Sequence, residues 1–151
     1  MNGFNVFKAP PFLLEKLGKI CILLRQGKSA YEQFAKNITD KDLRNTMLTL
    51  AQESNQFACE LSSQIETLGG VPNSENVNEA ITEDELIISS SDGNEILTLC
   101  KKNENKMVAA YGEILNDSFL YEGIRKMMRY QLREMLCNFM RLNQLGSLKF
   151  H

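Results

Sequence analysis

Apolar residues recur three and four positions apart along four segments of the chain, which is the spacing of one face of an α-helix. The first segment shows this pattern from Leu13 to Ile38, and the second shows it from Leu43 to Leu68. The third runs from Leu97 to Leu115, and the fourth runs from Ile124 to Leu142. No segment alternates apolar and polar residues as a strand would, so the sequence predicts an all-α protein with four helices.

Capping and turn residues indicate where these helices begin and end. Pro10 and Pro11 suit a first helical turn, where a missing N–H costs little, and either Thr39 or Asp40 can cap the second helix. Gly69 and Gly70 are typical of residues that follow a helix C-terminus. Together with the apolar pattern, these residues predict one domain over 1–151 with helices at about 11–38, 41–68, 93–117 and 120–146.

The connections between the predicted helices differ greatly in length. A few residues separate the helices within each half of the chain, whereas residues 69–92 lie between the second helix and the third. A loop of that length in a compact domain needs a structural reason. A crossover along the length of a four-helix bundle supplies one, and it would join two helical hairpins. The hairpins also resemble each other, because SAYEQFAKNI at 29–38 is similar to AAYGEILNDS at 109–118.

Three features of the chain resemble the ferritin-like superfamily: Glu104 seven residues before Tyr111, Glu53 within AQESNQ, and LGGVP at the end of the second helix. Within that superfamily, the chain is most similar to an uncharacterised bacterial family of small four-helix-bundle proteins, a domain of unknown function. The similarity covers about Leu17–Leu145. It implies a ferritin-like four-helix bundle with a long crossover. It implies little about activity, although related families suggest a role in stress response.

A dimetal site in such a bundle uses a glutamate from each of two helices and a Glu-x-x-His from each of the other two. Three carboxylates occupy such positions in this chain: Glu53, Glu104 and Glu134. Gln56 and Cys137 stand where the two histidines would be expected, and the one histidine of the chain is His151. We therefore expect no cofactor and no catalytic residues. The alternative is a degenerate iron or manganese site in an oxidase or a metal-storage protein.

Glu104 lies inside the apolar stripe of the third helix, so its carboxylate is expected to be buried and satisfied by hydrogen bonds. The candidate hydrogen-bonding partners are polar residues predicted on all four helices: Gln56, Gln131, Tyr31 and Asn103. Arg25 and Arg133 are the candidate cations. The alternatives are a single weak metal site and a Glu104 side chain that faces solvent.

The four cysteines contain no C-x-x-C pair, which excludes a zinc ribbon and a thioredoxin motif. They are Cys21, Cys59, Cys100 and Cys137, and we expect them to be reduced, buried and structural. In an alternative interpretation they form two redox-active pairs, Cys21 with Cys59 and Cys100 with Cys137. Such a pair requires both thiols to face each other.

Charge and hydropathy narrow the range of possible partners. The net charge of −2 and the absence of a nucleic-acid motif argue against nucleic-acid binding. No apolar run approaches the roughly 18 residues of a membrane span, and charged residues interrupt the N-terminal apolar stretch, so we expect a soluble, cytoplasmic protein.

The fourth helix carries features of a partner surface. A second set of apolar residues lies off its main stripe: Met127, Tyr130, Leu136 and Met140. The helix is also basic, whereas the chain has no Lys or Arg from Asn45 to Cys100. Because a helix with a wide apolar arc usually buries more than one face, we predict a homodimer through this helix. The expected role is therefore non-enzymatic, through oligomerisation or partner binding.

Overall fold

The computed structural model describes residues 9–71 and 93–149. Nearly all of them belong to four α-helices: α1 (Pro11–Lys36), α2 (Lys41–Thr67), α4 (Gly93–Leu115) and α5 (Glu122–Lys149). The described residues contain no strand, which confirms the prediction of an all-helical chain. The first three helices begin where the sequence placed them and end one or two residues earlier, whereas α5 begins at 122 and extends to 149. Most of the predicted crossover, residues 72–92, lies outside the described residues.

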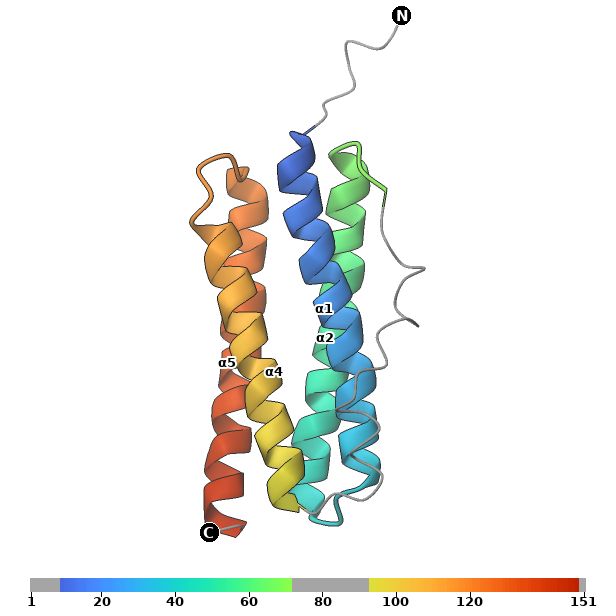
Figure 1. Ribbon diagram of the computed structural model, residues 1–151, viewed down its shortest axis with the longest axis vertical. Helices are drawn as coiled ribbons and strands as arrows, with labels where there is room; N and C mark the ends of the chain where they lie inside the picture. Colours follow the sequence, from blue (N-terminus) through green and yellow to red (C-terminus); the bar gives the residue numbers. More distant parts are fainter. Residues whose placement is uncertain (1–8, 72–92, 150–151) are drawn as a thin grey trace, which may run out of the picture.

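Each helix packs against two of the others, so the four form a bundle with α1 diagonally opposite α5 (Figure 1). The Ala9 N–H donates to the Leu68 carbonyl oxygen at 3.0 Å, which places the end of α2 beside the start of α1. Lys16 bonds Asp117 at 3.1 Å, which places the end of α4 there as well. Neighbouring helices are therefore antiparallel, and the diagonal partners α2 and α4 are parallel (Figure 1).

The apolar stripes of the four helices meet in a shared core. Leu17, Leu61, Ile96 and Met128, one from each helix, are all 0% exposed. Burying one such side chain stabilises the fold by about 1.5–3 kcal/mol, so this core supplies most of the driving force for bundling. The stripes predicted from the sequence are the buried faces of the helices. Among the helices of the described residues, none has an apolar stretch long enough to cross a membrane.

Both ends of α2 are capped by the residues that the sequence indicated. The Asp40 side chain accepts a hydrogen bond from the Leu43 N–H at 3.0 Å, as an N-cap residue does. Lys149 at the end of α5 pairs with Asp40 at 2.8 Å, so the cap also joins the two helices. At the other end, Gly69 has φ 88°, a left-handed conformation that costs glycine little and other residues more.

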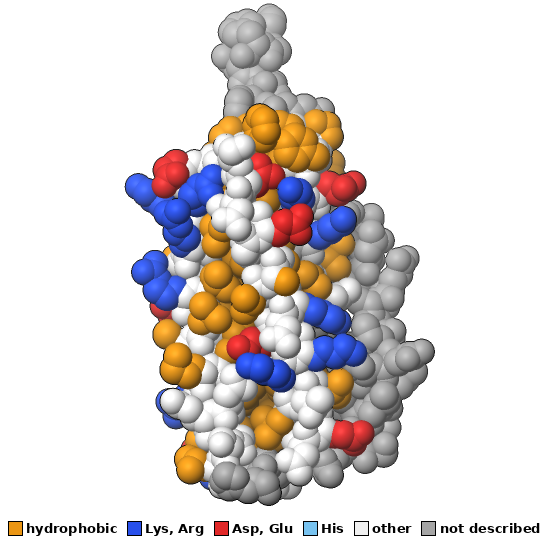
Figure 2. Space-filling view, turned by 60° about the vertical axis from the view of Figure 1, so that its left-hand side comes forward, with side chains coloured by type: hydrophobic (Ala, Val, Ile, Leu, Met, Phe, Trp, Pro, Cys, Tyr) orange, Lys and Arg blue, Asp and Glu red, His pale blue; other side chains and the backbone are white. Residues whose placement is uncertain are grey.

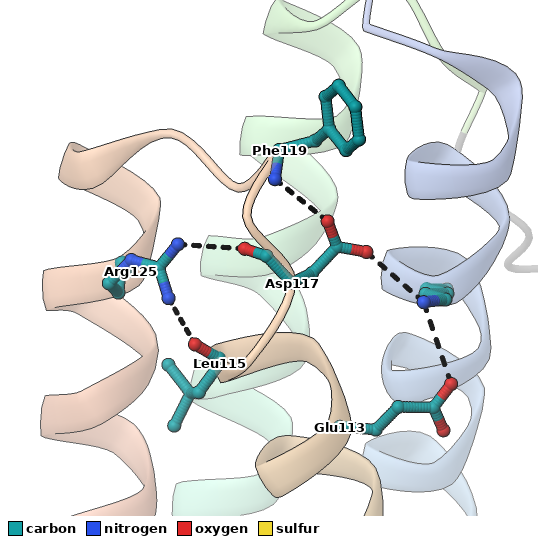
Figure 3. A network of polar contacts seen from close by, with 6 residues as sticks. Glu113, Leu115, Asp117, Phe119 and Arg125 are labelled. Carbon is teal, nitrogen blue, oxygen red and sulfur yellow. Dashed lines mark hydrogen bonds and ion pairs between the residues drawn. The ribbon is translucent and has the colours of Figure 1, made fainter.

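The turn between α4 and α5 is organised around Asp117 (Figure 3). Its carboxylate accepts from the Phe119 N–H at 2.9 Å and from the Lys16 ammonium at 3.1 Å. The Arg125 guanidinium donates to the main-chain oxygens of Leu115 and Asp117, so it satisfies carbonyl groups at the end of α4. This network holds α5 at a defined position relative to both α4 and α1.

Candidate functional site

Polar side chains line the contact between α2 and α5, which we call the α2–α5 seam; its residues are Glu53, Glu60, Gln131, Glu134 and Asn138. The Asn138 amide donates to Glu53 at 2.9 Å, and the Gln131 amide donates to Glu60 at 3.0 Å. Burial raises the pKa of Glu53, the bond from Asn138 lowers it, and the negative charge of Glu134 raises it further. The seam therefore holds partly buried carboxylates beside neutral amides.

A hydrogen-bonded chain runs from the core to the surface at this seam. The Tyr111 hydroxyl on α4 donates to the Gln131 side-chain oxygen at 2.8 Å, and both residues are fully buried. Gln131 donates to Glu60, which also accepts from the exposed Gln56 amide at 3.1 Å. Burial raises the pKa of Tyr111, so its phenol stays protonated and keeps donating at any ordinary pH. The sequence pattern did not indicate Glu60, because it lies outside the spacing of the ferritin-like ligands.

Tyr31 occupies the position in the first hairpin that matches Tyr111 in the second, yet its surroundings differ. Its hydroxyl accepts a hydrogen bond from the Asn103 amide at 2.9 Å. Burial, with a smaller contribution from Cys100, raises the pKa of Tyr31 well above its ordinary value. The similarity between the hairpins thus extends to two buried tyrosines but does not extend to their hydrogen-bond partners.

Glu104 lies at the contact between α4 and α5, and its side chain is 15% exposed. It accepts from the Asn143 amide at 3.2 Å and pairs with the Lys101 ammonium at 3.4 Å. The partners expected from the sequence form hydrogen bonds with other residues. Gln56 bonds Glu60, and Gln131 bonds Tyr111. Tyr31 and Asn103 bond each other. The i, i+3 spacing of Lys101 and Glu104 is a local signal that could have identified the lysine. Asn143 has no such signal.

The three predicted metal ligands lie on two sides of α5. Glu53 is close enough to Glu134 for their charges to interact, and it is bonded by Asn138. Glu104 is bonded by Asn143, which lies about 140° around the helix axis from Asn138. Within residues 9–71 and 93–149, no group of three or more His, Cys, Asp or Glu side chains is placed to hold a metal ion. A metal position shared by all three carboxylates stays a prediction.

The expectation of four buried cysteines is wrong for two of them. Cys21 and Cys100 are buried, whereas Cys59 and Cys137 are exposed, and all four are free. Cys59 follows the buried Ala58 by one residue, a step of about 100° around the helix, which turns its side chain out of the core. The two thiols of each proposed redox pair therefore lie in different environments, one buried and one exposed. Burial raises the pKa of Cys100, which makes that thiol unreactive.

Comparison with known proteins places the chain in a family. Residues 13–117 match the family described as a domain of unknown function, DUF2383. The match includes α1, α2 and α4 and ends in the turn before α5. No curated protein and no solved structure matches the chain. Since the match covers more than half of its length, and as the sequence resemblance indicated, the chain belongs to a family of unknown function, DUF2383.

Proposed function

We propose that this protein is a non-catalytic bundle protein that acts by binding a second copy of itself through α5. The proposal rests on what we call the outer face of α5, which comprises Lys126, Arg129, Tyr130, Arg133, Leu136, Cys137, Met140 and Arg141. All eight residues are exposed. A face that combines large apolar side chains with unpaired cations is typical of a protein-binding surface.

The apolar part of this face is the observation that carries the proposal. Tyr130 is 51% exposed, Leu136 is 37% exposed and Met140 is 60% exposed. Met127, the fourth residue of the predicted surface, packs partly against the core and contributes less. Figure 2 brings forward the side of the molecule where α4 and α5 lie, and hydrophobic side chains form patches down this side. Covering such side chains removes apolar area from water and favours association.

The charged part of the face supports the same proposal. Lys126, Arg129, Arg133 and Arg141 make no ion pair with any described residue. Arg125 differs from them, because its guanidinium is occupied by main-chain oxygens of the preceding turn. Unpaired arginines over a helix with exposed aromatic and methionine side chains are the composition enriched at interfaces.

The directions of the helices support a ferritin-like topology for the bundle. Each hairpin is antiparallel, and α2 ends at the opposite end of the bundle from the start of α4 (Figure 1). Ferritin-like folds share these directions and have their long crossover between the second and third helices. A role in stress response is part of the proposal on the strength of the sequence resemblance alone.

Light scattering at micromolar concentration tests the dimer. We expect a particle of twice the chain mass of 17.2 kDa. The double substitution Tyr130→Ser and Met140→Ser should give a monomer with an unchanged far-ultraviolet circular dichroism spectrum. The matched control is Leu48→Ser, which removes a residue that is 40% exposed on α2 and lines a pocket against α1, and it should leave the dimer intact. A monomeric wild-type protein would overturn the proposal.

An alternative function is metal binding by the carboxylates, with iron or manganese as the metal. One observation favours it: the negative charge of Glu134 disfavours the ionised form of the nearby Glu53 carboxyl, and a bound cation would relieve that repulsion. Metal analysis of protein purified without chelators tests this alternative. Stoichiometric metal that is lost in Glu53→Gln would support it, and metal at background level would reject it.

A further inference from the structure

Two rows of opposite charge run side by side along α5. The acidic row consists of three partly buried carboxylates at the α2–α5 seam: Glu53, Glu60 and Glu134. None of the three makes an ion pair with a described residue, and Glu53 and Glu60 accept hydrogen bonds from amide groups. The basic row consists of the four unpaired cations on the outer face of α5, which carries no acidic residue. Each protomer therefore presents both halves of a set of ion pairs without forming them.

The two rows also match in position along the helix axis. Because α2 and α5 are antiparallel, Glu60 lies level with Gln131 and Glu53 lies level with Asn138, as their hydrogen bonds require. The acidic row thus spans residues 131–138 of α5, and the basic row spans residues 126–141. Tyr130 and Cys137 are two helical turns apart and differ by only about 20° around the axis. They lie between Glu134 on one side and Lys126, Arg129 and Arg133 on the other, whereas Arg141 lies on the side of Glu134, about 20° from it.

The orientation of a twofold axis decides which side chains meet in a homodimer. With the axis perpendicular to the helices, α5 lies over the partner's α5, and the two basic rows face each other. With the axis parallel to α5, each residue meets partner residues at its own height. The acidic row of one protomer then faces the basic row of the other, and this contact occurs twice. Like charges in apposition cost free energy, whereas opposite charges fix the register, so the second orientation is favoured.

We propose that two copies associate along the α2–α5 seam about a twofold axis parallel to α5, with the carboxylates of each seam facing the basic row of the other copy. This inference rests on the proposed dimer. At the axis, Tyr130 and Cys137 meet their own counterparts in the second copy. Tyr130 is placed for this contact because its ring already packs edge-on against Phe57 of α2, with centroids 6.4 Å apart.

The two exposed cysteines allow a direct test by cross-linking. Cys137 lies at the proposed axis, whereas Cys59 lies on α2, one residue before Glu60 and about 100° away from it around the helix. A short bismaleimide should convert the wild type and the Cys59→Ser variant into covalent dimers and should leave the Cys137→Ser variant uncross-linked. Cross-linking that depends on Cys59, or a dimeric protein that does not cross-link, would show that the twofold axis does not pass near Cys137. Neither result would contradict the dimer itself.

Charge reversal of two adjacent residues tests the pairing of the rows. Arg133→Glu alone and Glu134→Arg alone each place like charges across the axis, and each should raise the dimer dissociation constant by about tenfold or more. An equimolar mixture of these two variants should form heterodimers, because the opposite charges then meet in both contacts. The combined variant, Arg133→Glu with Glu134→Arg, should also dimerise.

The outcomes separate this inference from the proposed function. If both single variants dimerise as the wild type does, the charge rows do not form the interface, and the inference is wrong while the dimer stands. If the wild type is a monomer in light scattering, the proposed function fails and the inference fails with it. The circular dichroism spectra of the two single variants must match that of the wild type. The formation of heterodimers in the mixture would show independently that both variants are folded.

Discussion

The buried hydrogen bond between Tyr111 and Gln131 allows a quantitative prediction. The Gln131 side chain is 0% exposed, and its oxygen is the acceptor for the Tyr111 hydroxyl at 2.8 Å. The substitution Gln131→Met keeps the length and approximate volume of the side chain but removes that acceptor. Among the described residues the Tyr111 hydroxyl donates to no other acceptor, so the substitution leaves a buried hydroxyl unsatisfied.

The cost follows from the burial of the two groups. A buried hydroxyl that loses its partner costs about 1–3 kcal/mol, so Gln131→Met should lower the free energy of unfolding by about 2 kcal/mol. Tyr111→Phe removes the donor and should cost about 1 kcal/mol. The double variant lacks both the donor and the acceptor of this bond, so neither is left without a partner. Its free energy of unfolding should be close to that of the wild type. The two substitutions should therefore be coupled by about 3 kcal/mol, the sum of the two single costs less the small cost of the double variant. Glu60 contributes little to this cost, because water reaches a partly exposed carboxylate.

Urea unfolding followed by circular dichroism measures the four free energies of this cycle, at one protein concentration because dimerisation shifts apparent stability. The matched control replaces Tyr111→Phe with Tyr31→Phe. The Tyr31 hydroxyl accepts from Asn103 and does not contact Gln131, so this second cycle should show no coupling. Additive effects of Gln131→Met and Tyr111→Phe would refute the reasoning, because they would mean that the bond contributes nothing that depends on both partners.

Two further predictions concern backbone conformation and pH. Gly27→Ala should raise the free energy of unfolding by about 0.5–1 kcal/mol, because alanine favours a helix interior over glycine and the added Cβ would lie at an ordinary contact distance of 3.6 Å from Asn103 and Ser54. Gly69→Ala should lower it by about 1–2 kcal/mol, because φ is 88° there, and urea unfolding that gives both changes the same sign would contradict this account. The hydrogen bond from Lys149 and the cap bond from the Leu43 N–H hold the pKa of Asp40 below its ordinary value. The resulting stabilisation is complete above the unfolded-state pKa of about 3.9 and is lost as the pH falls through the lower folded-state pKa. Asp40→Asn should therefore flatten the fall in melting temperature below about pH 4, and an unchanged pH profile would count against the Lys149 pair.

The helices of this protein could be predicted from the sequence because the signals are local. Asp40 caps α2 through a bond to a residue three positions later, and Gly69 ends it with its own backbone conformation. Gln131 lies three residues after Met128 and four before Met135, at the spacing of the apolar stripe in the fourth segment, and it is fully buried. A period of three to four residues follows from helical geometry alone and needs no knowledge of the neighbouring helices.

The polar contacts between helices could not be predicted in the same way. Gln131 bonds Tyr111 across 20 positions and Glu60 across 71, and Glu104 bonds Asn143 across 39. Such contacts depend on the rotation and register of each helix within the bundle. A rotation of about 100°, one residue's step, is enough to move a side chain from the core to solvent, as Cys59 and Ala58 show.

The sequence by itself thus determined that the chain forms four helices and which face of each helix is buried, because the hydrogen bonds and the apolar period of a helix are properties of adjacent turns. Only the tertiary structure decided that Glu53 and Glu134 lie together while Glu104 lies on the other side of α5. It also decided that Cys137 is exposed between an acidic row and a basic row. The physical reason is that helix rotation and register are set by the summed packing of many side chains, which no single motif encodes.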